Sequence, residues 1–431
     1  MKQYDYQTLN QNERASLVRR RGGDFAEVLP TVREVLQTVA KRGDDALVYY
    51  ARKFDGVEMS SLPVTEDEFR SATSTVSKER QQAIRDAAAS IKAYHAPQVP
   101  KPYEVETRRG VRCRLEWRSI RRVGLYVPGG SAPLVSTLLM LAIPAQIAGC
   151  REIVVVTPPR KDGTISDEIL FAAELLGVRT VFKIGGSQAI AAMATGTTSV
   201  PKVDKIFGPG NRYVTAAKAL IAQPPYNVAI DMIAGPTELL VIADDSSDPV
   251  FVASDLISQA EHGADSQVVL VTPSESLAKK VQLRLSEQLI SLPRSAIAQR
   301  ALESSLVIIV DNIEEAVGFS NSYAPEHLII ATDSAPDIAS KITNAGSVFL
   351  GQLTSVVFGD YASGTNHTLP TARTASAVGG LTVGSFMKPI FFQNVTKDGL
   401  QSLVRTTAIL AEAEGLEGHA RAARVREKAR D

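Results

Sequence analysis

The N-terminal part of the chain places apolar and charged residues at the spacing of a helix. Residues 1 to about 105 contain two long stretches of this kind, DFAEVLPTVREVLQTVAKR and ERQQAIRDAAASIKAYHA, and end in the breaker PQVPKPY. Apolar side chains three and four positions apart share one face of a helix, so both stretches predict amphipathic helices. We therefore expect a helical region at the start of the chain.

From about residue 120 the pattern changes to short β-branched runs separated by amphipathic stretches. A first series contains RVGLYVP, EIVVVTPP, TVFKIGG, KIFGPG and NVAIDM, and a second contains ELLVIAD, SQVVLVTP, LVIIVD, HLIIAT and GSVFLG. Strands that alternate with helices predict a parallel sheet. Past residue 380 the sheet pattern ends, and TKDGLQSLVRTTAILAEAEGL and EGHARAARVREKAR predict two helices of a polar tail.

These patterns predict an α/β fold of two tandem Rossmann-like open parallel-sheet units, with a helical N-terminal region and a helical C-terminal tail. The expected boundaries are 1–105 for the N-terminal region, 106–236 and 237–380 for the two units, and 381–431 for the tail. Because the tail has little apolar surface of its own, we expect it to pack on something else, such as a partner subunit.

The composition excludes several classes of partner. Lys and Arg together number 47, and so do Asp and Glu, which removes any electrostatic reason to expect nucleic acid or an anionic membrane surface. Cys113 and Cys150 are too few for a disulfide framework and are expected as free thiols in a reducing compartment. The N-terminus lacks the apolar core of a signal peptide, and no apolar stretch approaches the ~18 residues of a membrane span. We therefore expect a cytoplasmic protein that binds a small molecule.

Three glycine-bearing turns follow strands of the first unit: Tyr126-Val-Pro-Gly-Gly, Gly-Gly-Ser-Gln188 and Gly-Pro-Gly-Asn211. In open α/β sheets, ligands bind at the carboxyl ends of strands, where glycines let the backbone approach and helix N-termini favour anions. A dinucleotide site there is reasonable, although any one such turn is more often structural.

One of these turns imitates a dinucleotide fingerprint. Gly208-Pro-Gly210 is followed about twenty residues later by Asp231 at a strand end, where a ribose-binding acid would lie. We do not interpret it as a fingerprint, because Tyr213 stands at the third glycine position and Pro209 is unusual in the tight turn.

The scarce histidines mark the other candidate chemistry. Gln259 and His262 lie three apart on a predicted helix that ends near Gly263, so both share one face, yet such a pair is a weak metal signal because surface helices carry it by chance. His95 stands alone before the proline-rich linker, and we assign it no role.

Glu326 and His327 form an adjacent acid and imidazole just before the strand LIIAT. Such a pair could divide proton transfers, but neighbours on a regular strand point to opposite faces, so a shared site needs irregular backbone at Glu326. Asp360 opens a long polar, glycine-containing loop that reaches Thr371, and loops of this length are often functional. The alternative for each is a solvated surface.

The ordered motifs together resemble the histidinol dehydrogenase family over nearly the full chain. The resemblance is carried by the three glycine turns above and by Ala-Gly-Pro-Thr237-Glu, Ser-Gln259-Ala-Glu-His262-Gly, Ala-Pro-Glu326-His327-Leu and Gly-Asp360-Tyr-Ala-Ser-Gly-Thr-Asn-His, with Glu414 and His419 in the tail. The resemblance implies NAD-dependent oxidation of L-histidinol through L-histidinaldehyde to L-histidine, the last steps of histidine biosynthesis.

The resemblance also implies a role for each candidate residue. One zinc ion per subunit would be held by Gln259, His262, Asp360 and His419. His327 would be the general base for the alcohol, Glu326 would activate water on the aldehyde, and NAD would contact Tyr126, Gln188 and Asn211. The substrate would be bordered by Thr237, His367 and Glu414 together with the zinc ligands and the Glu326–His327 pair. A homodimer is implied in which the tail of one chain completes the site of the other.

Two departures and two rival functions stay open. Thr237 stands where the family more often has serine, and Phe386–Phe392 is more apolar than the family's usual polar run, so substrate fit or an interface could differ. The nearest rival is a paralogous zinc- and NAD-dependent alcohol dehydrogenase of the same fold that acts on another small alcohol. A rival of another class is a catalytically silent ligand-binding protein, which retention of all the candidate site residues disfavours.

Overall fold

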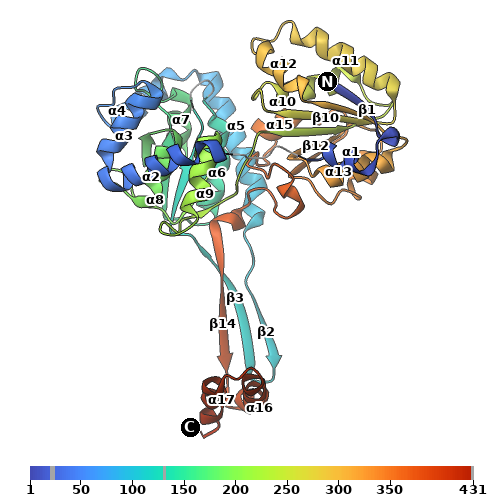
Figure 1. Cartoon of the computed structure of the whole chain (residues 1–431). Coiled ribbons are helices and arrows are strands. Elements are labelled where there is room, and N and C mark those ends of the chain that lie inside the picture. The colour runs from blue at the N-terminus through green and yellow to red at the C-terminus, as the bar shows by residue number, and fades with distance from the viewer. Residues whose placement is uncertain (20–24, 130–132, 429–431) are drawn as a thin grey trace.

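Two α/β units and a projecting arm make up the chain (Figure 1). The computed structural model describes residues 1–19, 25–129 and 133–428. The first unit contains five parallel strands in the order β6-β5-β4-β7-β8. They are β4 (Arg122–Tyr126), β5 (Glu152–Thr157), β6 (Val181–Lys183), β7 (Lys205–Phe207) and β8 (Ala229–Ile230). Successive strands are added outward from β4 on one side and from β7 on the other, so the strand order reverses between these two parallel strands.

Helices cover both faces of this sheet and bury a separate core on each. One core contains α4 (Glu66–Thr75), α5 (Lys78–His95), α6 (Val135–Ile147) and α7 (Asp167–Leu175). The other contains α2 (Leu29–Arg42), α3 (Asp44–Tyr50), α8 (Gly186–Thr195) and α9 (Arg212–Ile221). Leu125 faces the first core and Tyr126 the second, as the alternation of a strand requires. The early helices therefore pack on the first sheet rather than standing alone.

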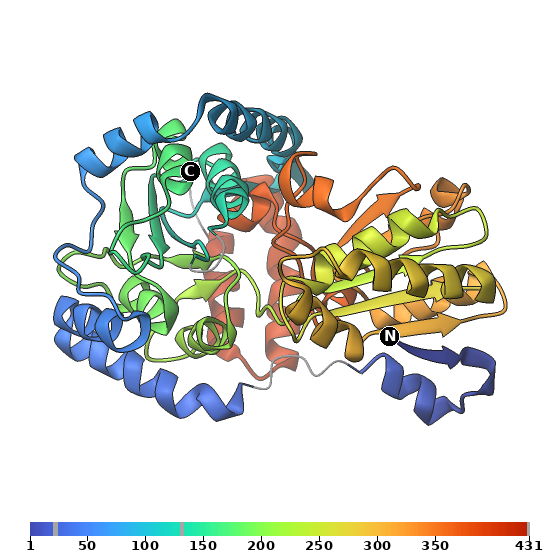
Figure 2. The same ribbon diagram turned by 90° about the horizontal axis from the view of Figure 1, so that it is seen from above.

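The second unit has six parallel strands in the order β1-β11-β10-β9-β12-β13. They are β1 (Lys2–Asp5), β9 (Glu238–Ile242), β10 (Gln267–Thr272), β11 (Leu306–Ile309), β12 (His327–Ile330) and β13 (Ser347–Leu350). All five residues of β9 are buried, which explains its continuous apolar run. The N-terminal strand β1 was not predicted, and it joins the edge of this sheet although the helices from α2 to α5 cover the other unit (Figure 2).

Helices again cover both faces of the second sheet. One face carries α10 (Pro249–Ala260), α11 (Glu275–Leu289), α12 (Ser295–Glu303) and the short α15 (Val356–Tyr361). The other face carries α1 (Gln11–Leu17), α13 (Ile313–Tyr323) and α14 (Ala335–Ala339). The prediction of an α/β fold with parallel sheets and helical ends is confirmed.

The arm corrects the expectation that the sheet pattern ends at residue 380. It is an antiparallel sheet of β2 (Tyr103–Arg108), β3 (Val111–Ser119) and β14 (Met387–Val395), and it ends in α16 (Lys397–Ala413) and α17 (Glu417–Arg424) (Figure 1). The expectation of an all-helical tail was wrong over Met387–Val395. Every residue of β14 after the first is exposed in this chain, so the strand shows none of the alternation by which a half-buried strand is recognised.

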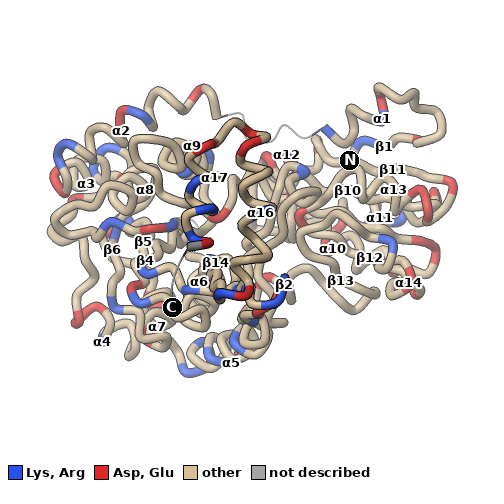
Figure 3. Tube along the Cα trace, turned by 90° about the horizontal axis from the view of Figure 1, so that it is seen from below, with Lys and Arg blue, Asp and Glu red and all other residues tan. Residues whose placement is uncertain are grey.

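Acidic and basic residues are interspersed along the chain trace in Figure 3, including α16 and α17. This distribution agrees with the equal numbers of the two charges in the sequence. None of the helices in the described ranges is both long and apolar enough to cross a membrane.

Candidate active site

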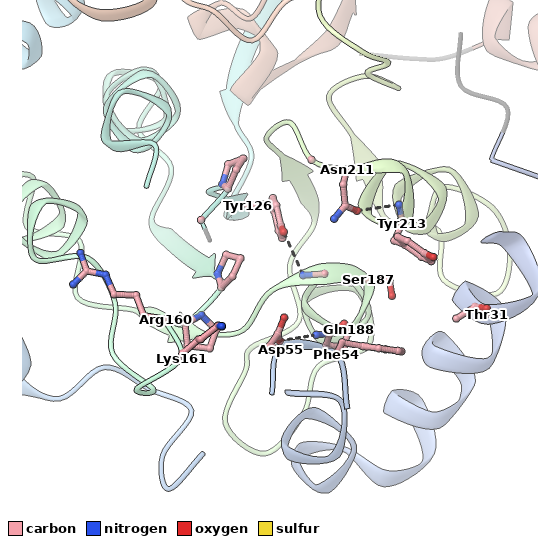
Figure 4. A pocket seen from close by; sticks show the side chains of 16 residues that line it. Thr31, Phe54, Asp55, Tyr126, Arg160, Lys161, Ser187, Gln188, Asn211 and Tyr213 are labelled. Atoms are coloured by element: carbon pink, nitrogen blue, oxygen red, sulfur yellow. Dashed lines mark hydrogen bonds between the residues drawn. The ribbon is translucent and has the colours of Figure 1, made fainter. Parts of the chain in front are cut away.

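A cavity of about 880 Å³ lies at the carboxyl ends of the first sheet, where the strand order reverses between β4 and β7 (Figure 4). Tyr126 ends β4, Gln188 lies in the first turn of α8, and Asn211 caps the N-terminus of α9. All three line the cavity. Open α/β sheets bind dinucleotides at this position.

Two of these side chains keep a hydrogen-bond donor for a ligand. Asn211 Oδ1 accepts from Tyr213 N at 3.0 Å and Val214 N at 3.2 Å, while its Nδ2 has no partner within the described residues. The Tyr126 hydroxyl accepts from Gly186 N at 3.2 Å, and burial raises the pKa of Tyr126 to about 12. The hydroxyl therefore keeps its proton at neutral pH and can donate it.

Asp231 serves the backbone of the Gly208 turn. Its carboxylate forms a buried ion pair with Lys218 and accepts hydrogen bonds from Gly208 N at 2.8 Å and Met232 N at 2.6 Å. Lys218 Nζ also donates to the Gly208 carbonyl at 2.9 Å. These contacts stabilise the turn that leads to Asn211. The Asp231 carboxylate is thus used within the protein, in agreement with the interpretation that it is not a ribose-binding acid.

A second cavity, of about 640 Å³, adjoins the first. Gly210 and Asn211 line both cavities, and Thr237 and His262 line the second. Because Thr237 directly precedes β9, the second cavity leads from the first unit to the start of the second sheet. A ligand bound in the first cavity can therefore reach side chains of the second unit.

Glu326 and His327 meet Thr237 at the amino ends of the neighbouring strands β9 and β12. Glu326 Oε2 accepts hydrogen bonds from the Thr237 hydroxyl at 2.6 Å and from Glu238 N at 2.9 Å. His327 Nδ1 lies 3.5 Å from the same oxygen. Because β12 begins only at His327, the preceding Glu326 is not bound by strand alternation, and the two side chains share one site.

His327 is buried between amide and acidic groups. Its Nδ1 lies 2.9 Å from Gln259 Nε2 and 3.1 Å from the Glu238 carbonyl oxygen, and its Nε2 lies 3.7 Å from Asp360 Oδ1. Burial alone would lower its pKa, but the carboxylates of Glu326 and Asp360 outweigh burial and raise the pKa of His327 to about 10. The charge on this imidazole therefore depends on the two carboxylates beside it.

Three histidines act electrostatically on Asp360. Burial would raise the pKa of Asp360, but His327, His367 and His262 outweigh burial and lower it. His367 reaches the first unit, since its Nε2 lies 3.3 Å from the hydroxyl oxygens of Ser136 and Thr137 near the start of α6. Burial is the main cause that lowers the pKa of His367.

A buried carboxylate ties the helices that carry Gln259 and Asp360. Asp255 lies on α10 one turn before Gln259, and it accepts hydrogen bonds from the Ser355 hydroxyl and from Val356 N at the start of α15. Asp360 lies near the other end of α15. The tie fixes the spacing between α10 and α15 and therefore the approach of Gln259 to Asp360.

Two local expectations need correction. Asp360 lies on the short helix α15 rather than in a loop, because the Ser355–Val356 backbone is capped by Asp255 and begins a helical turn. His262 lies two residues past the end of α10, since the helix stops at Ala260. Gly130 of the first glycine turn lies outside the described residues.

Comparison with known proteins decides the family. The model of the histidinol dehydrogenase family matches residues 18–427. The chain belongs to this family. Histidinol dehydrogenase of Mannheimia succiniciproducens is 50% identical over 94% of this chain and 93% of its own length, and that of Bacteroides thetaiotaomicron is 50% identical over 96% of both chains. The crystal structure of histidinol dehydrogenase from Elizabethkingia anophelis superimposes with a TM-score of 0.94 at 47% identity, covering 99% of this chain and 98% of that one.

The resemblance to histidinol dehydrogenases drawn from the motifs is thus confirmed, but one chain does not assemble every residue that the resemblance groups together. Thr237, Gln259, Glu326, His327 and Asp360 lie together. Glu414 caps the C-terminus of α16, and His419 lies on α17, where it lines a separate cavity beside Thr396 and Leu400 at the end of the arm (Figure 1). Within the described ranges, no group of three or more His, Cys, Asp or Glu side chains could hold a metal ion.

Sequence reasoning missed two residues that contribute to this histidinol dehydrogenase fold. Asp255 precedes Gln259 by four positions on the predicted helix, so its place on the same face could have been noticed. Asp55 lines the first cavity from the N-terminal region, and nothing in the local pattern connects it with strands that follow some seventy residues later.

Proposed function

We propose that the protein oxidises L-histidinol through L-histidinaldehyde to L-histidine in the cytoplasm, with NAD as the hydride acceptor of both steps. The observation that carries this proposal is the continuity of the two cavities, which share Gly210 and Asn211 and lead from the dinucleotide position to Thr237 beside Glu326. Relatives named histidinol dehydrogenase cover nearly the whole chain, which favours histidinol over another small alcohol.

His327 and Glu326 divide the proton transfers. His327 acts as the base in its neutral form, in which Nδ1 donates to the Glu238 carbonyl oxygen and Nε2 takes the hydroxyl proton as the carbinol carbon loses its hydride. The carboxylates of Glu326 and Asp360, which raise the pKa of His327, stabilise the imidazolium that forms. Glu326, oriented by Thr237 and Glu238 N, takes a proton from the water that adds to the aldehyde. The hydrate then loses the second hydride, so each turnover consumes two NAD and one water.

Gln259, His262 and Asp360 are proposed to hold one zinc ion, with His419 from a second copy of the chain. The fit rests on Gln259 Oε1, which is buried without a hydrogen-bond partner in the described structure, and on a donor set of oxygen and imidazole nitrogen. When bound, zinc supplies open positions for the imidazole and amino nitrogens of the substrate.

Elemental analysis tests this ligand set. His262→Ala and Asp360→Ala proteins should each lose zinc together with activity, because each substitution removes one ligand. Full zinc occupancy in both variants would refute the assignment.

A homodimer in which each tail completes the other chain's site accounts for the position of the tail. Glu414 and His419 lie at the far end of the arm, away from Asp360 (Figure 1). The arm exposes large apolar side chains, with Tyr103 59% and Phe391 72% exposed, which a partner subunit would cover. Two-fold exchange of the arm would produce two equivalent composite sites.

Mixed dimers test the composite site. His327→Ala and His419→Ala proteins should each be nearly inactive, and should be unfolded together and reassembled. Half of randomly paired dimers are mixed, and half of the sites in a mixed dimer have both histidines, so activity should recover to roughly a quarter of the wild-type value. Recovery near zero, with mixed dimers demonstrated by mass spectrometry, would mean that each tail serves its own chain.

The activity itself is tested by NADH formation from histidinol before and after removal of metal. NADH should form with the metal-loaded protein, cease after treatment with a chelator, and return when zinc is restored. Undiminished activity after verified metal removal would contradict the proposed role of zinc, and absence of NADH formation by the loaded protein would contradict the proposed reaction.

A further inference from the structure

Asp55 places a carboxylate in the wall of the first cavity that the proposed reaction does not use. It ends the π-helical turn Ala51–Asp55 that continues α3, and Gly56 follows in the left-handed conformation with φ of 70°. Asp55 Oδ2 accepts a long hydrogen bond of 3.5 Å from Gln188 Nε2 (Figure 4). No other hydrogen bond and no ion pair reaches this carboxylate in the part of the chain that the structure describes.

The burial of this carboxylate is not compensated by the protein. Burial raises the pKa of Asp55 to about 6, and no cation offsets it. Arg160 and Lys161 line the same cavity, yet neither forms an ion pair with Asp55. A half-buried carboxylate with unused acceptor positions fits a ligand that donates hydrogen bonds to it.

The order of the two cavities indicates which half of a dinucleotide meets Asp55. The nicotinamide ring must reach the second cavity, which Thr237 and His262 line, to accept hydride near His327. Asp55 lines only the first cavity. The adenosine half of the dinucleotide therefore lies in the first cavity, on the side of Asp55. NAD differs from NADP only at the 2′ position of the adenosine ribose.

We propose that Asp55 accepts hydrogen bonds from the hydroxyls of the adenosine ribose and so selects NAD over NADP. This inference rests on the proposed function, which places NAD in the first cavity. Two vicinal hydroxyls can donate to a carboxylate, whereas a 2′-phosphate removes one of these donors and brings like charge beside it. The selecting acid thus comes from a turn of the N-terminal region rather than from the end of a strand in the sheet.

Titration of the full-length protein with NADH and with NADPH, followed by nucleotide fluorescence without substrate, tests the proposal. Asp55→Asn should bind NADH roughly tenfold more weakly, because it loses a hydrogen bond to a charged acceptor. Its affinity for NADPH should be equal or higher, so the preference for NADH over NADPH should fall at least about tenfold. Asp55→Ser, which is neutral and smaller, should show the same loss of preference.

Glu58→Gln is the matched control. Glu58 lies three positions further along the chain, is exposed, and pairs with Arg52 at 2.9 Å without lining the cavity. This variant removes the same charge from the same region and should keep the wild-type preference. Thermal melting of each variant by circular dichroism verifies the fold, and the serine variant gives the result if the asparagine variant does not fold.

The outcomes separate this inference from the proposed function. If folded Asp55 variants keep the wild-type preference, or lose NADH and NADPH affinity equally, the role of Asp55 is refuted while wild-type binding of NADH leaves the proposed function intact. If Glu58→Gln loses the preference as strongly as Asp55→Asn, the effect is one of net charge and the role of Asp55 is also refuted. If the wild-type protein binds no NADH, the proposed function fails, and this inference fails with it.

Discussion

Replacing Thr237 with valine tests the role of Glu326 with little change in side-chain shape. The Thr237 hydroxyl donates the 2.6 Å hydrogen bond to Glu326 Oε2, so the variant leaves Glu238 N, at 2.9 Å, as the hydrogen-bond donor to that oxygen. A hydrogen bond to a charged group contributes about 1.5 to 3 kcal/mol, which corresponds to a rate loss of roughly 10- to 150-fold if Glu326 acts in the transition state. We expect this loss in the oxidation of histidinaldehyde, because only the aldehyde needs activated water.

The assay is NADH formation at saturating histidinol and, separately, at saturating histidinaldehyde. Thr237→Ser keeps the hydroxyl donor and should oxidise the aldehyde within about threefold of the wild-type rate, which separates loss of the hydrogen bond from general disturbance of the site. Equal slowing of both half-reactions by Thr237→Val, or aldehyde oxidation at the wild-type rate, would refute this reasoning.

Three further predictions address neighbouring groups. Glu326→Gln should still oxidise histidinol to the aldehyde but should be slow with supplied aldehyde, whereas His327→Asn should impair both half-reactions. Selective slowing of the first step by Glu326→Gln would contradict the assigned roles of the two residues. Asp255→Asn and Ser355→Ala should each weaken zinc binding roughly tenfold in chelator competition, because each weakens the hydrogen bonding between α10 and α15. Unchanged zinc affinity in both variants would show that this hydrogen bonding does not position the ligands. Because the pKa of Asp55 is raised to about 6 in the fold, its ionisation costs stability as the pH rises through the range between the ordinary value of 3.8 and 6. The shift corresponds to at most ~3 kcal/mol, which solvent contact of this partly exposed group reduces to about 1 kcal/mol. Asp55→Asn should therefore be more stable than wild type to denaturant at pH 7.5, with a smaller difference at pH 4.5; a constant difference would contradict the assigned cause.

The sheet units could be predicted because their strands are buried. The continuous apolar run of Leu239–Ile242 and the glycine turns after the first-unit strands follow directly from parallel strands covered on both faces. The strands Lys2–Asp5 and Met387–Val395 gave no such signal, because one is a short edge strand and the other is exposed on both faces in the isolated chain. Periodicity reports burial, so it does not detect strands whose apolar side chains remain uncovered within one subunit.

The site was only partly predictable for a related reason. Glu326 and His327 are adjacent in sequence, and the sequence already indicated that irregular backbone would be needed to join them. Asp55 contacts Gln188, and Asp255 contacts the start of α15. In both cases the partner is distant in sequence, so the contact forms only once the helices have packed. The spacing of residues along the sequence does not indicate such long-range contacts.

The central claim is that one site carries out both oxidations of histidinol. The most direct measurement is the amount of NADH formed when a limiting amount of L-histidinol is consumed to completion with excess NAD, with the product identified by mass spectrometry. We expect two NADH for each histidinol and L-histidine as the product. One NADH for each histidinol, with the aldehyde as the end product, would contradict it.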